Sequence, residues 1–104
     1  MAGISLFMAF GLSNSGNTYY LKPNLMRVIG TQQHGDINVT FFHWNNRYLI
    51  KVEAGPYEQT YKIQEFDLSS EEELSRIVST EFIEECIKLF DQMAGSLQKS
   101  IERL

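Results

Sequence analysis

Apolar residues recur every three or four positions from residue 69 to residue 104, which is the spacing of one side of an α-helix. The pattern predicts a long amphipathic helical segment at the end of the chain. Only a sheet or another helix can bury such a side, so a partner for it is expected upstream. The stripe consists of Leu74, Ile77, Val78, Phe82, Ile83, Cys86, Ile87, Phe90, Met93, Ala94, Leu97, Ile101 and Leu104.

The start of this segment carries capping signals. Ser69 with Glu72, or Ser70 with Glu73, has the spacing of a capping box, and three consecutive glutamates suit the positive end of a helix dipole. At Ser79 and Thr80 two alternatives are open. The segment either runs on as one helix with a bend, which the continuous stripe favours, or divides into a short and a long helix with Thr80 as the new N-cap.

The upstream half of the chain reads as strands, most clearly around Asn45-Asn46. Residues 37–44 and 47–53 flank these two asparagines, which tolerate the positive φ angles of a type I′ turn. A two-residue loop determines the register, so Trp44 is expected opposite Arg47 and Val39 opposite Val52. A second turn at 54–57 leads to a further strand over 58–66.

Three more strands are expected at residues 4–11, 19–22 and 25–33. The predicted fold is therefore α+β. It is an antiparallel β-meander of about five or six strands packed against a long C-terminal amphipathic helical segment. At 104 residues the chain is long enough for one core, so residues 1–104 are expected to form a single domain. Residues 1–68 would form the sheet and residues 69–104 the helical segment.

Alternation along the three clearest strands separates two faces. The apolar face, where the helix is expected, holds Val39, Phe41, His43, Tyr48, Ile50, Val52, Tyr61 and Ile63. The opposite face mixes large apolar side chains with cations, and we take it as a candidate binding face formed by Phe42, Trp44, Arg47, Leu49, Lys51 and Lys62. Burial against the N-terminal strands or a second subunit would explain this mixture. Stacking of bases on the rings, with cations along the phosphates, is the alternative.

The charge distribution bears on that choice. The formal net charge is −4. The half before Ser69 is neutral, so the acidic excess lies on the helical segment. Attraction to phosphate requires a positive field, which disfavours nucleic acid as a partner and argues against an anionic membrane surface.

No stretch has the pattern of a catalytic or metal site. With a turn at Gly35-Asp36, His43 would lie about 20 Å from His34 along the strand that follows, which is too far for the two to share an ion. Cys86 falls within the apolar stripe, where a free cysteine behaves as a small hydrophobic side chain. We therefore expect no metal, no cofactor and no enzymatic activity. An enzyme with an unrecognised site is the weakest of three alternatives.

The single cysteine is typical of a reducing compartment. The apolar run 4–10 has the length of a signal-peptide core, but Met1, Ala2 and Gly3 lack the positive side chain of a secretory leader. A cytoplasmic location is therefore expected, with secretion as the disfavoured alternative. The run is also too short to span a bilayer.

A meander followed by a long helix is similar in element order to Whirly-type single-strand DNA-binding proteins, which dimerise through such helices. It is also similar to pleckstrin-homology-like domains, in which a C-terminal helix closes a strand-rich sandwich. Both resemblances cover most of the chain and include no shared sequence motif, and a similar fold does not carry function.

The leading functional hypothesis is a small non-enzymatic binding or assembly module that forms a homodimer or binds another protein. A helix from Thr80 to Leu104 would be roughly 37 Å long, which is longer than a small sheet is wide. Its last turns are therefore the expected contact with another chain. The residues on the apolar side of these turns are Met93, Leu97, Ile101 and Leu104.

Overall fold

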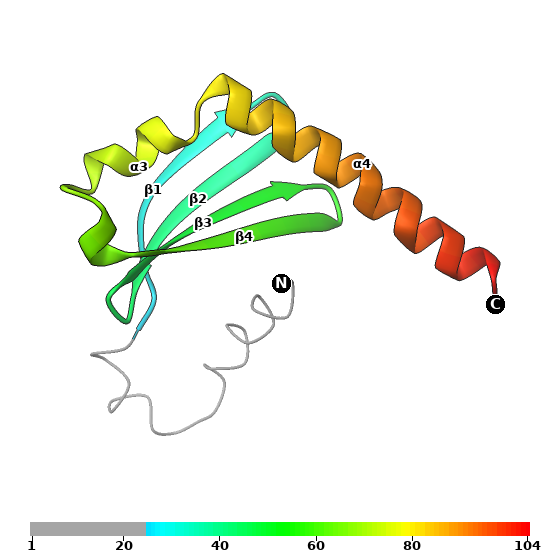
Figure 1. Ribbon diagram of the computed structural model, residues 1–104, viewed down its shortest axis with the longest axis horizontal. Coiled ribbons are helices and arrows are strands. Elements are labelled where there is room, and N and C mark those ends of the chain that lie inside the picture. The colour runs from blue at the N-terminus through cyan, green and yellow to red at the C-terminus, as the bar shows by residue number, and fades with distance from the viewer. Residues whose placement is uncertain (1–24) are drawn as a thin grey trace.

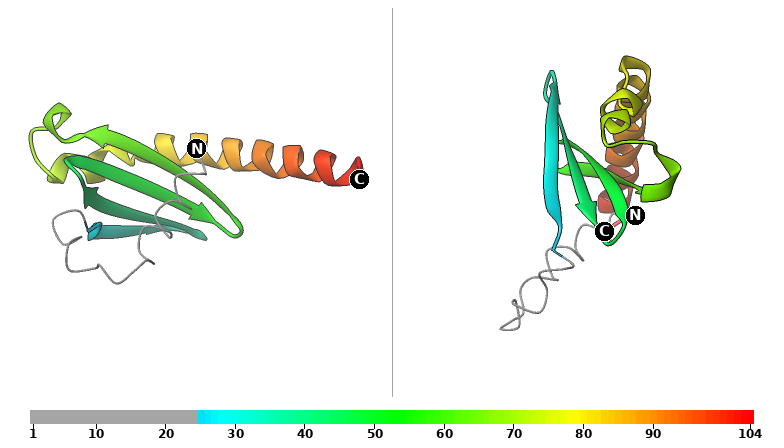
Figure 2. Two further views of the ribbon diagram at one scale, coloured as in Figure 1. Left: turned by 90° about the horizontal axis from the view of Figure 1, so that it is seen from below. Right: turned by 90° about the vertical axis from the view of Figure 1, so that its left-hand side faces the viewer.

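The computed structural model describes residues 25–104, which form an antiparallel sheet followed by two helices on one of its faces (Figure 1, Figure 2). A 3₁₀ turn over Glu65–Asp67 joins the sheet to the helices α3 (Glu72–Ile77) and α4 (Thr80–Glu102). The α+β class, the antiparallel sheet and the long C-terminal helix are thus confirmed. The strands, in their order across the sheet, are β1 (Arg27–His34), β2 (Ile37–Trp44), β3 (Arg47–Ala54) and β4 (Tyr57–Gln64).

The sheet has four strands, so the expected count of five or six is wrong for the part of the chain that the structure describes. The strand expected at 25–33 is β1. The candidates at 4–11 and 19–22 lie outside the described residues. The higher count depended on those two segments, whereas the strands seen here are all joined by two-residue turns.

The turns set the register that the sequence predicted. Asn45 and Asn46 have φ angles of 54° and 62°, as a type I′ turn requires, and Gly55 has a φ of 60° in the next turn. Trp44 pairs with Arg47 across the first turn, as expected. The residues of β2, β3 and β4 therefore lie on the predicted faces. No faces were predicted for β1, whose pairing with β2 shifts register between Val28 and Gly30.

The core forms between the predicted apolar face and the helices. Val39 and Val52 are completely buried, and Ile50 is 1% exposed. Helix residues cover them, chiefly Leu74, Val78, Ile83, Cys86 and Phe90, which belong to the same buried cluster. Close-packed burial of this kind supplies most of the stability of a small domain.

The helical segment is broken and not merely bent. Helix α3 ends at Ile77, and Ser79 has an extended backbone with a ψ of 175°. The Ser79 hydroxyl oxygen accepts a hydrogen bond from the amide of Phe82 at 3.2 Å, so Ser79 is the N-cap of α4. The prediction of Thr80 as the cap is wrong by one residue. Val78 enters the core at the break, so the chain changes direction without exposing the apolar stripe.

A short polar chain also fastens α4 to the sheet at β4. The Tyr61 hydroxyl donates to Gln59 Oε1 at 2.6 Å, and Gln59 Nε2 donates to the backbone oxygen of Cys86 at 2.9 Å. The Tyr61 ring packs edge-on against Phe82, with ring centres 5.3 Å apart. Burial, reinforced by the neighbouring Cys86 thiol, raises the pKa of Tyr61 to about 12.

The Asn45-Asn46 turn yields a test of the hairpin. We expect Asn46→Gly to leave the free energy of unfolding unchanged or slightly higher, because glycine adopts positive φ without strain. Asn46→Ala should lower it by about 1 kcal/mol, since the alanine Cβ disfavours this conformation. Urea denaturation of both variants measures the difference, and equal stability of the two would contradict the assigned turn.

The Tyr61 hydroxyl predicts an alkaline loss of stability. Its pKa is higher in the folded protein than the ordinary 10.0, so it contributes stability that is fully present below about pH 10 and is lost as the pH rises through about 12. We expect Tyr61→Phe to remove this loss and to reduce the tyrosine absorbance change that occurs above pH 11 in an alkaline titration. An unaltered titration curve above pH 11 would show that the Tyr61 hydroxyl is not shielded.

Candidate functional site

The last turns of α4 extend past the β3–β4 turn and away from the sheet (Figure 1). Every residue from Gly95 to Leu104 is exposed. Leu97 and Ile101 are each 50% exposed, and Leu104 is fully exposed. Met93 lies at the boundary, partly buried and packed against the core. The structure therefore places three of the four expected contact residues on open surface, and the fourth at the edge of the sheet.

A groove runs along this part of α4, beside the β3–β4 turn. Its volume is about 530 Å³, and Tyr57, Leu89, Met93 and Leu97 provide its apolar lining. Sequence reasoning missed Tyr57 and Leu89. The turn at 54–57 was predicted, but only the packing of α4 across β4 brings Tyr57 beside the helix.

The opposite sheet face is less open than its composition suggests. Leu49 is 1% exposed and lies between Phe42 on β2 and Lys62 on β4, its partners across the strands. Trp44 and Arg47 are half-buried, and of the six candidate residues only Lys62 is exposed. The structure therefore brings these six side chains onto one face but leaves little of their apolar surface accessible.

Lys51 on this face is held by acidic neighbours. Its ammonium nitrogen lies 3.9 Å from a carboxylate oxygen of Glu53 and 3.8 Å from one of Glu58. The Lys51 side chain is only 20% exposed. Paired carboxylates cancel the field that a phosphate backbone would need, so this geometry weighs against the nucleic-acid hypothesis.

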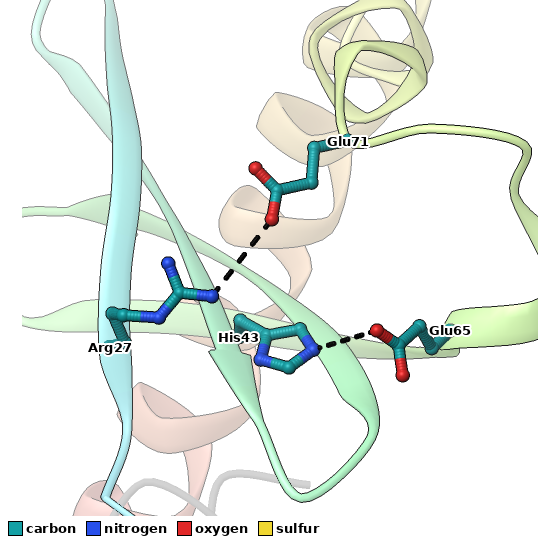
Figure 3. A network of polar contacts seen from close by, with 4 residues as sticks. All are labelled: Arg27, His43, Glu65 and Glu71. Atoms are coloured by element: carbon teal, nitrogen blue, oxygen red, sulfur yellow. Dashed lines mark hydrogen bonds and ion pairs between the residues drawn. The ribbon is translucent and has the colours of Figure 1, made fainter.

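Four polar side chains lie near the start of β1, at the end of the sheet where β2 and β4 finish (Figure 3). They are Arg27, His43, Glu65 and Glu71. His43 Nε2 lies 3.1 Å from Glu65 Oε2, and the His43 ring packs edge-on against Tyr48. Arg27 approaches Glu71 at 4.0 Å. Burial raises the pKa of Tyr48, both glutamates add to the effect, and Arg27 opposes it. A histidine and a carboxylate do meet here, a pairing that the sequence did not predict.

A second cleft, of about 270 Å³, lies between β1 and α3. Its lining includes Gly30, Phe41 and Leu74 but not His43. The His43 and Glu65 pair is therefore not directed into this cleft. General acid or base catalysis needs such a pair within reach of a bound substrate.

Cys86 is 1% exposed, on the side of α4 that faces the sheet. Burial raises the pKa of the Cys86 thiol, Glu85 raises it further, and the contact with the Tyr61 hydroxyl lowers it. The thiolate is the reactive form, so this position suits an inert core residue rather than a nucleophile.

We expect the Cys86 thiol to react with Ellman's reagent at pH 8 at least roughly 100-fold more slowly in the folded chain than in guanidinium chloride, because reaction requires local unfolding. A Ser100→Cys, Cys86→Ala variant, with its thiol on the exposed end of α4, should react rapidly without denaturant. Fast labelling of the folded wild-type chain would contradict the buried position.

Among residues 25–104 no group of three or more histidine, cysteine or acidic side chains is arranged to hold a metal ion. No helix in the same range is long and apolar enough to cross a membrane. In comparisons with known proteins, no family model matches the chain, no curated protein matches its sequence, and no solved structure matches its fold.

Proposed function

We propose that the chain is a small, non-enzymatic assembly module that binds a second copy of itself through the last turns of α4. The observation that carries the proposal is the exposure of Leu97, Ile101 and Leu104 beyond the sheet. Large apolar side chains grouped on a surface are typical of an interaction site, whereas isolated ones are not.

The three residues continue the side of α4 that packs on the sheet. Phe90, Leu97 and Leu104 follow one another at intervals of seven residues, so they lie on nearly the same side of the helix. Phe90 is 7% exposed because the sheet covers it. We therefore treat α4 as one amphipathic helix whose apolar side has an intramolecular partner in its first half and an intermolecular partner in its second.

The charge of this surface favours a copy of the same chain. Residues 91–104 carry two acidic side chains, Asp91 and Glu102, and two basic ones, Lys99 and Arg103. The side-chain charges of residues 91–104 therefore sum to zero, and two copies of this stretch have no net repulsion between them. A membrane-surface helix would instead need a polar side rich in cations.

Substitution of Leu97 tests the proposal. We expect the wild-type chain to form a dimer in sedimentation equilibrium at high protein concentration. Leu97→Glu should weaken the dimer at least about thirtyfold, because each interface would lose two leucines and gain two carboxylates against apolar surface. The free energy of unfolding of the monomer should change little, since Leu97 lies beyond the core.

Gln98→Glu is the matched control. It introduces the same charge one residue further along α4, about 100° around the helix from Leu97. We expect it to leave the dimer dissociation constant within a few-fold of the wild-type value. A wild-type chain that sediments as a strict monomer, or equal effects of the two substitutions, would overturn the proposal.

A further inference from the structure

The direction in which two copies pair can be inferred from the position of the sheet beside α4. Ile83, Cys86 and Phe90 face the sheet of their own chain. Leu97 and Leu104 lie on the same side of the helix, seven and fourteen residues beyond Phe90. The side of α4 that would contact a partner is therefore the same side that packs against the sheet in the first half of the helix.

This arrangement obstructs a parallel pair. Packed helices approach to 8–10 Å, so a parallel partner helix would have to run through the space beside Phe90 and Cys86. The sheet fills that space, as both residues are buried there. In an antiparallel pair the partner's α4, which ends at Glu102, reaches that end before it meets the sheet, and the two sheets then lie at opposite ends of the pair.

Charge supports the same direction. Residues 80–90 carry three acidic side chains, Glu81, Glu84 and Glu85, against the single cation Lys88. A parallel pair would bring these two acidic halves side by side. An antiparallel pair places each of them at the opposite end, beyond the neutral turns that make contact.

We infer that the last turns of α4 pair antiparallel across a two-fold axis, so that the end of each helix enters the groove of the other copy. This inference rests on the proposed function. The groove beside the β3–β4 turn, lined by Tyr57, Met93 and Leu97, lies where the partner's Leu104 would arrive. In this register Met93 contacts the partner's Leu104, and Leu97 contacts the partner's Ile101. The β3–β4 turn thus becomes part of the interface, and the second copy completes the groove.

Disulfide cross-linking distinguishes the two directions, since the Cα atoms of a disulfide must lie within about 7 Å. Met93→Cys and Leu104→Cys are prepared separately in a Cys86→Ala background and checked for folding by circular dichroism. Copper-phenanthroline oxidation of the mixture should produce roughly tenfold more cross-linked dimer than oxidation of either variant alone. Leu104→Cys alone should match a Lys99→Cys control, whose thiol lies on the far side of the helix, because residues 104 of an antiparallel pair lie about 15 Å apart along the helix.

Self-linking of Leu104→Cys, with no gain on mixing, would show parallel pairing and overturn the inference while leaving self-association intact. A wild-type chain that is monomeric in sedimentation would instead overturn the proposed function. If Met93→Cys fails to fold, Ala94→Cys probes the same level of the helix. The inference is also overturned if the wild-type chain is a dimer but Leu104→Cys cross-links with neither Met93→Cys nor Ala94→Cys, since the interface would then lie elsewhere.

Discussion

Burial of one sheet face under α3 and α4 is the constraint on which the rest of this structure depends. Val39, Ile50 and Val52 have almost no contact with solvent, and among residues 25–104 the helices contribute Leu74, Val78, Ile83, Cys86 and Phe90 to the cluster around them. The same burial orients α4, since Ile83, Cys86 and Phe90 must all reach the sheet at once. The bond from Gln59 to the Cys86 carbonyl then secures a position that packing has already set.

The size of the sheet limits how much of α4 it can cover. Four strands about 4.8 Å apart are roughly 14 Å across, and an eight-residue strand is about 26 Å long. Helix α4 has 23 residues and is therefore about 34 Å long. A helix that crosses the strands obliquely must extend past the sheet, and Figure 1 shows the last turns of α4 beyond the β3–β4 turn. The continuous run of exposed residues begins at Gly95. The exposed apolar residues are thus a consequence of geometry.

The sequence was most predictive where local chemistry decides the structure. Asn45-Asn46 specified a turn, the turn specified the register of β2 against β3, and this register assigned the residues of these two strands to their faces. The N-cap of α4 was misplaced by one residue because Ser79 and Thr80 are both good caps, and only the entry of Val78 into the core selects Ser79.

The candidate surfaces were less predictable because they depend on contacts between distant segments. The exposure of Leu97, Ile101 and Leu104 followed from helix length alone. The neighbouring Tyr57 lies more than thirty residues upstream of Leu89, and only the packing of α4 across β4 brings the two together. Similarly, the pairing of His43 with Glu65 depends on the 3₁₀ turn after β4, which has no strong sequence signal.

The contrast between the two exposed surfaces indicates why α4, rather than the sheet, is the better candidate for a partner. On the sheet face Leu49 is only 1% exposed, and Lys51 is balanced by Glu53 and Glu58. The apolar side of α4 beyond Met93 is far more open, since Leu97 and Ile101 are each 50% exposed and Leu104 is fully exposed. The side-chain charge also changes along the helix, from a net −2 over residues 80–90 to zero over residues 91–104. This surface is exposed and carries no net charge. A second copy of the chain can therefore cover it without electrostatic repulsion.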